Sequence, residues 1–396
     1  MSWKASSIVQ QREEFVKLAR QKIAAFGQLC RRFSISRKTG YKWLKRRDGE
    51  GLRGLCDRSR RPQRRPSAQA RWRNKVVALR HRYRTWGAKK LHALLAQQYG
   101  RRGLPCVRSM ERWLKEKGLL RRWRPVRRGP ALPYRGLTVP RRAHQVWTVD
   151  FKGWYRTRDG QRQEPLTVRE LHTRYLLAIR LLSNQSEEQV RKVFCGVFGK
   201  HGLPEVIRVD NGAPFGGTGA LGLTRLSVWW ERLGVRVEFT RRARPGDNAG
   251  HEQMHGIFAR EVAARPGANR ASEQRRIDRW RKQYNERRPH EGLGQRPPAA
   301  RYRPSPRPYE AEPPALVYSA AWKVRRVRPH GDIKWHGRLR FIGRAFVGQS
   351  VGLKPIETDC WEVYLGKLLI GQLHASDAAS MRPTRRSGCR NLQPES

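Results

Sequence analysis

The N-terminal part of the chain has apolar residues at roughly helical spacing, interrupted by a short polar break. The apolar positions include Leu18, Ile23, Phe26, Leu29 and Phe33. After the break, Ser36 is a suitable N-cap for a basic helix over residues 37–46, with Tyr41 and Leu44 expected on its inner face. Because a helix, a short turn and a second, basic helix form the helix-turn-helix pattern, we predict such a domain over residues 10–56.

The second helix of this pattern has the basic side chains that we expect to contact DNA: Arg37, Lys38, Lys42 and Arg46. Such side chains bind phosphate oxygens or the edges of bases. An ordinary basic helical hairpin has the same pattern, but the concentration of charge on the second helix favours DNA reading.

A second group of helices follows an Arg- and Pro-rich stretch. The periodicity predicts helices over 74–84, 88–99 and 107–117, which resemble a second helix-turn-helix domain at 70–120. Residues 121–143 are rich in Arg and Pro without periodicity, and we interpret them as a basic linker.

From residue 144 the pattern changes to short apolar runs that alternate with helical segments. Strands are predicted at 146–151, 166–168, 175–182, 205–210 and 234–240. Helices are predicted at 187–200, from 247 or 248 towards 264, and at 276–286. Strands followed by alternating helices and strands indicate an α/β sheet layered with helices, so we predict one α/β domain over 144–295.

The C-terminal part reads as a separate β-rich region. A Pro-rich linker is expected at 297–308, and short strands with Gly at the turns over 310–375 favour a small β-barrel. Residues 376–396 are expected to be a disordered tail. The predicted fold class is multidomain: an all-α helix-turn-helix N-terminal region, an α/β region and a small β-barrel-like C-terminal region.

Charge narrows the range of partners. The chain has 86 Lys and Arg against 32 Asp and Glu, a net charge of +54. Residues 1–144 hold 41 basic and 7 acidic side chains, so most of the excess lies in about a third of the chain. A genome that favours Arg codons would raise the charge evenly, whereas this distribution favours nucleic acid as the polyanionic partner.

Cysteines and hydropathy bear on the compartment. The 6 cysteines form no Cys-x-x-Cys pair and no plausible disulfide framework, which indicates a reducing compartment. The N-terminus lacks the apolar core of a signal peptide, and no run approaches the ~18–20 apolar residues of a membrane span. We therefore expect a soluble, cytoplasmic protein associated with the nucleoid, and no membrane partner.

Three acidic residues lie on separate predicted elements of the α/β region. Asp150 and Asp210 each end a predicted strand, and Glu252 lies in the first turns of the following helix. Ligands of α/β sheets gather at the carboxyl ends of strands, so both aspartates could face one crevice. Carboxylates suit Mg²⁺ or Mn²⁺, and two such ions about 3.5–4 Å apart can hold both oxygens of a phosphoryl displacement. These three residues are the candidate catalytic and metal-binding residues.

Two other acids lie on or beside the same helix. Asp247 precedes the helix and is better explained as its cap. Glu261 lies nine positions beyond Glu252, which is about 13 Å along the axis and on nearly the opposite face. We therefore expect Glu252, and not Glu261, to face the two aspartates.

Residues 251–255, His-Glu-Gln-Met-His, also match the zinc-protease pattern H-E-x-x-H. That interpretation needs a third ligand, and Glu273 is the nearest candidate by spacing. It leaves Asp150, Asp210 and the high charge unexplained, so it is the less favoured alternative. On the favoured interpretation, His251 and His255 are ordinary polar residues of the helix.

Several short motifs occur in a fixed order in the α/β region. They are Trp147-Thr148-Val149-Asp150, Val209-Asp210-Asn211-Gly212-Ala213-Pro214-Phe215, Leu226-Ser227-Val228-Trp229-Trp230, Pro245-Gly246-Asp247-Asn248-Ala249-Gly250-His251-Glu252-Gln253-Met254-His255, and Tyr284-Asn285-Glu286-Arg287-Arg288-Pro289-His290-Glu291. This order resembles insertion-sequence transposases with the retroviral-integrase type of Asp-Asp-Glu core. The resemblance covers roughly residues 10–300 and is most specific over 145–295. The chain departs from the family's pattern at Gln253 and Gly256, and in a longer interval between Asp210 and Glu252, with the extra length in the glycine-rich stretch 216–222.

The resemblance implies an RNase H-like core in which Asp150 bridges two Mg²⁺ (or Mn²⁺) ions and Asp210 and Glu252 each complete one. It implies cleavage at the 3′ ends of transposon DNA and strand transfer into target DNA. The implied partners are double-stranded DNA, namely the terminal inverted repeats and the target, and other copies of the chain in an oligomer on DNA. The alternative is a domesticated, non-catalytic DNA-binding protein with the same fold, which is disfavoured because all three acids are present.

Overall fold

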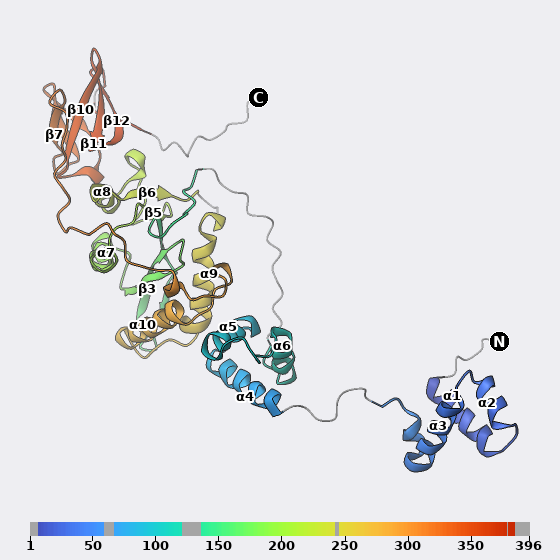
Figure 1. Cartoon of the computed structure of the whole chain (residues 1–396). Coiled ribbons are helices and arrows are strands. Elements are labelled where there is room, and N and C mark those ends of the chain that lie inside the picture. Colours follow the sequence, from blue (N-terminus) through green and yellow to red (C-terminus); the bar gives the residue numbers. More distant parts are fainter. Residues whose placement is uncertain (1–6, 59–66, 121–135, 242–244, 378, 385–396) are drawn as a thin grey trace. The chain divides into compact units, whose positions relative to one another are not determined.

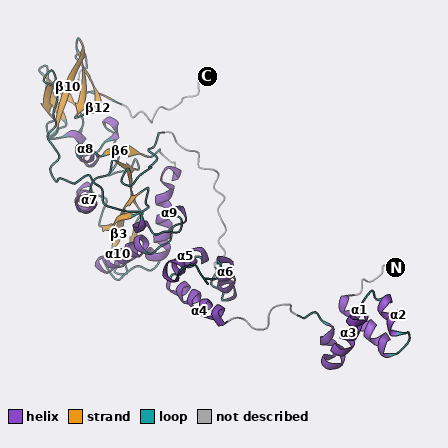
Figure 2. Cartoon of the chain, in the orientation of Figure 1, coloured by secondary structure: helices purple, strands orange, loops and turns teal. Residues whose placement is uncertain are grey.

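The computed structural model describes residues 7–58, 67–120, 136–241, 245–377 and 379–384 (Figure 1). Most of the predicted basic linker at 121–143 therefore lies outside the described residues. Two compact units are present, residues 1–70 and 71–396, and each is described on its own. Figure 2 shows that the N-terminal elements of both units are helical and that the described strands come later in the chain.

The first unit contains the helix-turn-helix pattern that the sequence predicts. Its helices are α1 (Ile8–Arg20), α2 (Phe26–Arg32) and α3 (Arg37–Glu50). As predicted, Ser36 caps α3, because its side chain accepts a hydrogen bond from the Thr39 amide at 3.1 Å. This bond satisfies one of the free amides in the first turn of the helix.

The inner face of α3 differs from the prediction. Tyr41 is 61% exposed, whereas Trp43 is 6% exposed and belongs to the core of this unit. The cause is Gly40, where an added Cβ would lie 2.9 Å from Phe15 and Cys30. Because the helices approach so closely at this glycine, the face with Gly40 and Trp43 turns inward and Tyr41 turns outward.

The second unit begins with a three-helix group, as the periodicity predicts. It consists of α4 (Ser67–Arg82), α5 (Ala88–Tyr99) and α6 (Val107–Glu116). Their core contains Trp86 together with buried residues of α5, such as Leu91 and Leu95, and of α6, such as Met110. Arg80 fastens the connections, since its guanidinium donates to the carbonyl oxygens of Trp86 at 2.8 Å and Leu119 at 3.1 Å.

A mixed sheet forms the centre of the α/β region. Its strands are β1 (Val146–Phe151), β2 (Tyr155–Arg156), β3 (Arg162–Glu170), β4 (Leu176–Leu182), β5 (Val206–Val209) and β6 (Arg236–Phe239). β1 pairs antiparallel with β3, which also pairs with β4 and the short β2. On its other edge β1 pairs parallel with β5, and β5 with β6. The predicted strands are therefore confirmed, and β1 lies in the middle of the sheet.

Helices cover both faces of this sheet. Trp147 and Val149 point to the face covered by α7 (Glu187–His201) and α8 (Arg225–Arg232). The alternate residues of β1 point to the opposite face. That face is covered by α9 (Ala249–Phe258), which continues as a π-helical turn at Ala259–Ala263, and by α10 (Arg270–Glu286).

The segment expected to be a Pro-rich linker, 297–308, packs against the α/β region instead. Tyr302 is 8% exposed, its ring stacks on Tyr175 at 3.8 Å, and its hydroxyl lies 2.7 Å from Nδ1 of His201. The Leu203 amide donates to the carbonyl of Arg307 at 2.9 Å. Contacts with distant parts of the sequence hold this segment, so local composition alone does not predict its position.

The C-terminal region is β-rich, as predicted, but closure into a barrel is not confirmed. A five-stranded sheet has the order β13-β12-β11-β10-β7, and a separate hairpin pairs β8 with β9. The strands are β7 (Lys323–Arg326), β8 (Asp332–Trp335), β9 (Arg338–Phe341), β10 (Ser350–Glu357), β11 (Cys360–Leu365), β12 (Leu368–His374) and β13 (Arg382–Pro383). In the part of the chain that the structure describes, β7 and β13 are the open edges of the sheet. β13 falls within the predicted tail, 376–396, of which residues 378 and 385–396 lie outside the described residues.

The glycine-rich stretch 216–222 and the residue after it pack against the C-terminal region. Ala220 and Leu223 are buried in one cluster with Phe346 and other apolar residues of the C-terminal region. Arg232 of α8 also donates to the Gln349 side chain at 2.6 Å. The extra length between Asp210 and Glu252 thus includes apolar residues that pack against the C-terminal region.

Candidate active site

The register of β1 and β5 brings Asp150 and Asp210 next to each other. Val146 pairs with Val206 and Thr148 with Arg208. Asp150 lies two positions beyond Thr148 within β1, and Asp210 lies two positions beyond Arg208, one residue past the end of β5. Neighbouring strands are about 4.8 Å apart, and residues in register point to the same face. The expected meeting of the two aspartates at the carboxyl ends of adjacent parallel strands is therefore what the sheet produces.

The electrostatics of Asp150 reflect these acidic neighbours. Burial, then the carboxylate of Asp210 and, more weakly, that of Glu252 together raise the pKa of Asp150 to about 7, although the Phe151 amide and Lys152 act in the opposite direction. Opposing ionised carboxylates favour the protonated form of one of them. A divalent cation would relieve this repulsion, so the group as it stands is suited to binding a cation.

Asp210 is exposed, and its position is set by the turn after β5. It accepts a hydrogen bond from the Gly212 amide at 3.2 Å. Although the residue as a whole is exposed, the neighbouring protein atoms partly desolvate its carboxyl group and raise its pKa despite that bond. The next residue, Asn211, donates its side-chain amide to the carbonyl of Thr240 at 2.6 Å. The turn that presents Asp210 is thereby tied to the end of β6.

Glu252 lies on the first turn of α9, half-buried, and its charge reaches Asp150. The three predicted acids therefore share one electrostatic environment. Among the described residues, however, no three His, Cys, Asp or Glu side chains are close enough together to hold one metal ion. The oxygen donors fit Mg²⁺ or Mn²⁺ in kind, and Glu252 and the aspartates would have to draw closer to share an ion.

Buried histidines and threonines hold α9 against the sheet behind these acids. His251 lies 2.7 Å from the Thr148 hydroxyl through Nδ1 and 2.5 Å from the Thr167 hydroxyl through Nε2. The Thr167 hydroxyl also contacts Nε2 of His255 at 2.9 Å and donates to the Asp150 carbonyl at 2.7 Å. This network fixes the backbone of Asp150 relative to the helix that carries Glu252.

The two imidazoles in this network are neutral. Burial, followed by the charges of Lys152 and Arg169, lowers the pKa of His255 to about 3, and burial, followed by His255 and Arg169, lowers the pKa of His251 well below its usual value. The 3.8 Å approach of His255 Nδ1 to Asp150 is therefore a contact between a neutral ring and a carboxyl group, not an ion pair. Sequence reasoning predicted both histidines as polar helix residues, and it missed Thr148, Thr167 and Arg169.

The zinc-protease alternative finds no support in these contacts. Both ring nitrogens of His251 already face threonine hydroxyls. Glu273, the candidate third ligand, accepts from Tyr155 at 2.8 Å, the Gly267 amide at 2.7 Å and Arg276 at 2.5 Å. These residues serve as structural hydrogen-bonding groups.

The prediction for Asp247 as a helix cap is wrong. Its carboxylate accepts from the backbone and side chain of Arg241 at 2.6–3.0 Å, which lowers the pKa of Asp247. Asn248 occupies the N-cap position of α9, but its side chain makes no capping hydrogen bond there. The strong attraction of a nearby guanidinium outweighs the weaker capping interaction.

Glu261 is engaged elsewhere, as its place on the helix predicts. It accepts from Trp280 at 2.6 Å and from Arg288 at 2.6 Å, and it also contacts Thr85. The Glu261 and Arg288 side chains are 10% and 5% exposed. Glu261 therefore joins α10 and the three-helix group to the end of α9.

The predicted DNA-contacting residues of α3 lie in the separate first unit. Arg37, Lys38 and Lys42 are exposed, whereas Arg46 is half-buried, with its guanidinium 5.2 Å from the centroid of the Trp43 ring. Three of the four side chains thus lie on a surface accessible to a partner. Their assignment to DNA remains a prediction.

Comparisons with known proteins show which families and relatives this chain resembles. An integrase core domain model matches residues 233–298, which contain α9 and α10. A model for the C-terminal domain of IS481 family transposases matches 322–377, and one for the leucine-zipper of insertion element IS481 matches 9–83. The predicted resemblance to insertion-sequence transposases with an integrase core is thereby confirmed.

Two relatives from insertion elements support this grouping. The insertion element IS407 uncharacterized 31.7 kDa protein of Burkholderia multivorans is 28% identical over 55% of this chain and 76% of its own length. The insertion element IS476 uncharacterized 39.2 kDa protein of Xanthomonas euvesicatoria is 26% identical over 57% of this chain and 62% of its own length.

Solved structures with some likeness are retroviral integrases. The HTLV-2 integrase catalytic core domain in complex with magnesium aligns over 41% of this chain and 99% of its own, at 8% identity and a TM-score of 0.32. The simian T-cell lymphotropic virus intasome in complex with PP2A regulatory subunit B56 gamma aligns over 78% of this chain and 99% of its own, at 12% identity and a TM-score of 0.36.

Proposed function

We propose that this chain is a DNA transposase that cleaves the 3′ ends of transposon DNA and joins them to target DNA at Asp150, Asp210 and Glu252. The observation that carries the proposal is the placement of Asp150 and Asp210 at the ends of the paired parallel strands β1 and β5, where burial and then the neighbouring acids raise the pKa of Asp150 to about 7. A non-catalytic DNA-binding protein is not favoured, because it would not require these acids.

The three acids are the residues that would hold divalent metal. The charges of both Asp210 and Glu252 act on Asp150, so Asp150 is the candidate for a ligand shared by two ions. Bound Mg²⁺ or Mn²⁺ would neutralise the charge that develops on the phosphate and polarise its oxygens.

The residues behind the three acids orient them. The hydroxyl of Thr167 holds the Asp150 backbone, and His251 joins β1 and β3 to α9 through two threonines. Because both histidines of α9 are neutral and buried, they add no positive charge that would compete with a cation. Their role is to position the acids.

DNA recognition belongs, in this proposal, to the basic helices. Arg37, Lys38 and Lys42 on α3 are accessible, and Arg46 would contribute from the flank of the same helix. Two transposon ends must be held together during strand transfer, so we propose that the chain acts as an oligomer on DNA.

A nicking assay tests the proposal. Duplexes with candidate inverted repeats, taken from the DNA that flanks the gene, are incubated with the full chain in Mg²⁺ or in chelator. We expect cuts at the 3′ ends in Mg²⁺ alone, and none from Asp150→Asn or Asp210→Asn, with DNA binding by both variants close to that of the parent. Cutting by either variant at the parent rate would remove the assignment of the acids.

A further inference from the structure

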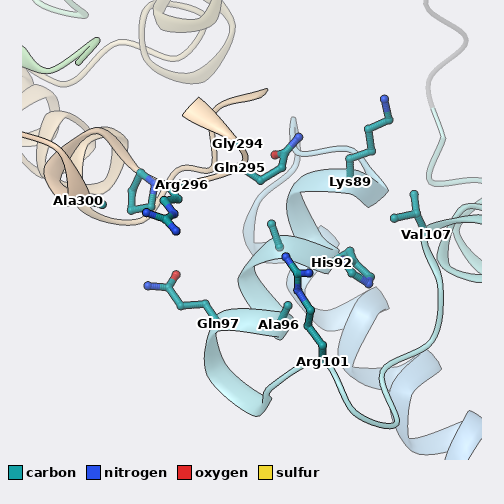
Figure 3. Close-up of a pocket in the computed structure, with 12 residues that line it drawn as sticks. Lys89, His92, Ala96, Gln97, Arg101, Val107, Gly294, Gln295, Arg296 and Ala300 are labelled. Carbon is teal, nitrogen blue, oxygen red and sulfur yellow. The ribbon is translucent and has the colours of Figure 1, made fainter. Parts of the chain in front are cut away.

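A pocket of about 720 Å³ lies between α5 and the segment that follows α10 (Figure 3). Lys89, His92 and Arg101 line it on the side of the three-helix group, and Arg296 lines it from the other side. None of the described residues that line this pocket is acidic, and none of the three candidate catalytic acids is among them. The proposed chemistry therefore does not account for it.

Both walls of the pocket are held in place by contacts next to it. Lys90 of α5 donates to the carbonyl of Pro289 at 2.6 Å. Burial and the charge of Arg288 lower the pKa of Lys90 to about 8, so this side chain is largely withdrawn from solvent. The Arg288 guanidinium lies 5.7 Å from the centroid of the Trp86 ring, which connects the same two walls. The pocket is thus bounded by packed elements.

The charges in the pocket favour an anionic ligand. Lys89 meets Glu291 at 3.4 Å, but both side chains are exposed at the rim, where such a pair is weak. Among the described residues, neither Arg101 nor Arg296 has a carboxylate partner in a salt bridge. Burial, and then the charge of Arg101, lower the pKa of His92.

We propose that this pocket binds the sugar-phosphate backbone of DNA, an inference that rests on the proposed function and extends it. The guanidinium groups of Arg101 and Arg296 present the planar donor pairs that suit phosphate oxygens. The side-chain amide of Gln97 can donate to the same backbone, and Ala96 offers a small apolar surface to the sugars (Figure 3). Ala93 also lines the pocket. The pocket is far larger than one phosphate ion, which fits a continuous strand better. One DNA molecule would then be held by α5 and by the segment after α10 together.

The test compares two pairs of arginines in the full chain. Arg101→Ala/Arg296→Ala removes the two guanidinium groups from the pocket. Arg102→Ala/Arg301→Ala removes the same charge from exposed neighbours that do not line it. Binding of a fluorescent DNA duplex of scrambled sequence is measured against salt concentration in chelator, so that no chemistry takes place.

Each phosphate contact contributes roughly 0.9 to the slope of log affinity against log salt, so the pocket pair should lose close to 2 from the slope. The matched pair should lose much less, and both should melt within a few degrees of the parent. Equal losses for the two pairs would assign the effect to diffuse surface charge and overturn the proposal, as would no loss from the pocket pair.

Inorganic phosphate separates the two sources of the ligand chemistry. If inorganic phosphate protects Arg101 and Arg296 of the parent from modification while the DNA slope of the pocket-pair variant equals the parent's, the site takes a free anion and the DNA proposal fails. Failure of the proposed chemistry would appear only in the nicking assay, so the two inferences fail independently.

Discussion

Acidic side chains of the α/β region occur in two different settings. Glu261 and Asp247 each accept hydrogen bonds from an arginine, Arg288 and Arg241, at 2.6 Å. The environment of Asp150 is instead dominated by burial and by other carboxylates. In a chain with 86 Lys and Arg, arginine partners are abundant.

The difference separates acids that stabilise the fold from acids that are held ready for a ligand. A carboxylate paired with arginine is already compensated and gains little from a cation. Adjacent carboxylates that oppose each other's ionisation are stabilised when a divalent ion binds. The helix α9 and its continuation carry both Glu252, whose charge raises the pKa of Asp150, and Glu261, which accepts from Arg288, so the two acids can be compared within a single element.

The largest expected effect comes from replacing each of the two acids of this helix by glutamine in a separate variant. Glu252→Gln should lower Mg²⁺-dependent cleavage by at least about 10²–10³-fold, the range for losing one charged group that stabilises a transition state. Glu261→Gln should leave cleavage by the folded protein within a few-fold of the parent. The measurement is the single-turnover rate of nicking, with circular dichroism as a check of folding. The reverse pattern would show that the comparison assigns the wrong acid to the site.

The second effect concerns stability. Glu261→Ala leaves the buried guanidinium of Arg288 without its partner, and removing one member of a buried ion pair costs about 3–5 kcal/mol. Chemical denaturation of the full chain should show this loss in the free energy of unfolding. Glu286→Ala, at the exposed end of α10, is the matched control and should change it by less than about 0.5 kcal/mol. Similar losses from the two variants would mean that the Glu261 contacts are not stabilising.

The third effect tests the network behind the acids. His251→Ala removes the imidazole from the Thr148 hydroxyl and one of the two imidazoles that contact the Thr167 hydroxyl, so we expect a loss of about 1–3 kcal/mol in stability. Cleavage by the protein that remains folded should fall only partially, because the imidazole touches no reacting group. Addition of Zn²⁺ should restore nothing. If Zn²⁺ restored activity to His251→Ala or His255→Ala, the zinc alternative would be supported instead.

The sequence predicts local elements well because their signals are local. The N-cap Ser36, the apolar periodicity of α5 and the short apolar strand before Asp210 each depend on neighbouring residues. The approach of Asp150 to Asp210 is also predictable, because parallel strands in one α/β sheet end at the same edge.

The failures all depend on contacts between distant residues or on competition between partners. Tyr41 is exposed because Gly40 packs against α1, and the Pro-rich segment is held by His201 and Tyr175. Asp247 prefers a guanidinium to a capping position. Barrel closure depends on the pairing of edge strands that lie far apart in sequence, and no local pattern encodes it.

The last prediction concerns Glu231 of α8, another acid with a raised pKa. Burial raises the pKa of Glu231 to about 7, although its carboxyl accepts a hydrogen bond from the Val237 amide at 2.7 Å and lies near Arg236. A raised pKa therefore also occurs in an acid whose contacts are structural. What distinguishes Asp150 is the presence of other acids as a cause of the shift.

The sign of the pH dependence follows from that shift in the pKa of Glu231. Between the ordinary value of 4.5 and about 7 the folded chain binds a proton more tightly than the unfolded chain. The contribution of Glu231 to stability is therefore present below pH 4.5 and is lost as the pH rises through about 7. Glu231→Gln keeps an acceptor for the Val237 amide but cannot ionise, so it should be more stable than the parent by about 1–3 kcal/mol at alkaline pH and similar to it in acid. Denaturation of both proteins across this range measures the difference, with Glu188→Gln on the surface of α7 as the control. A constant difference at every pH would mean that Glu231 ionises in the folded chain as easily as in water, and that burial here does not disfavour a carboxylate.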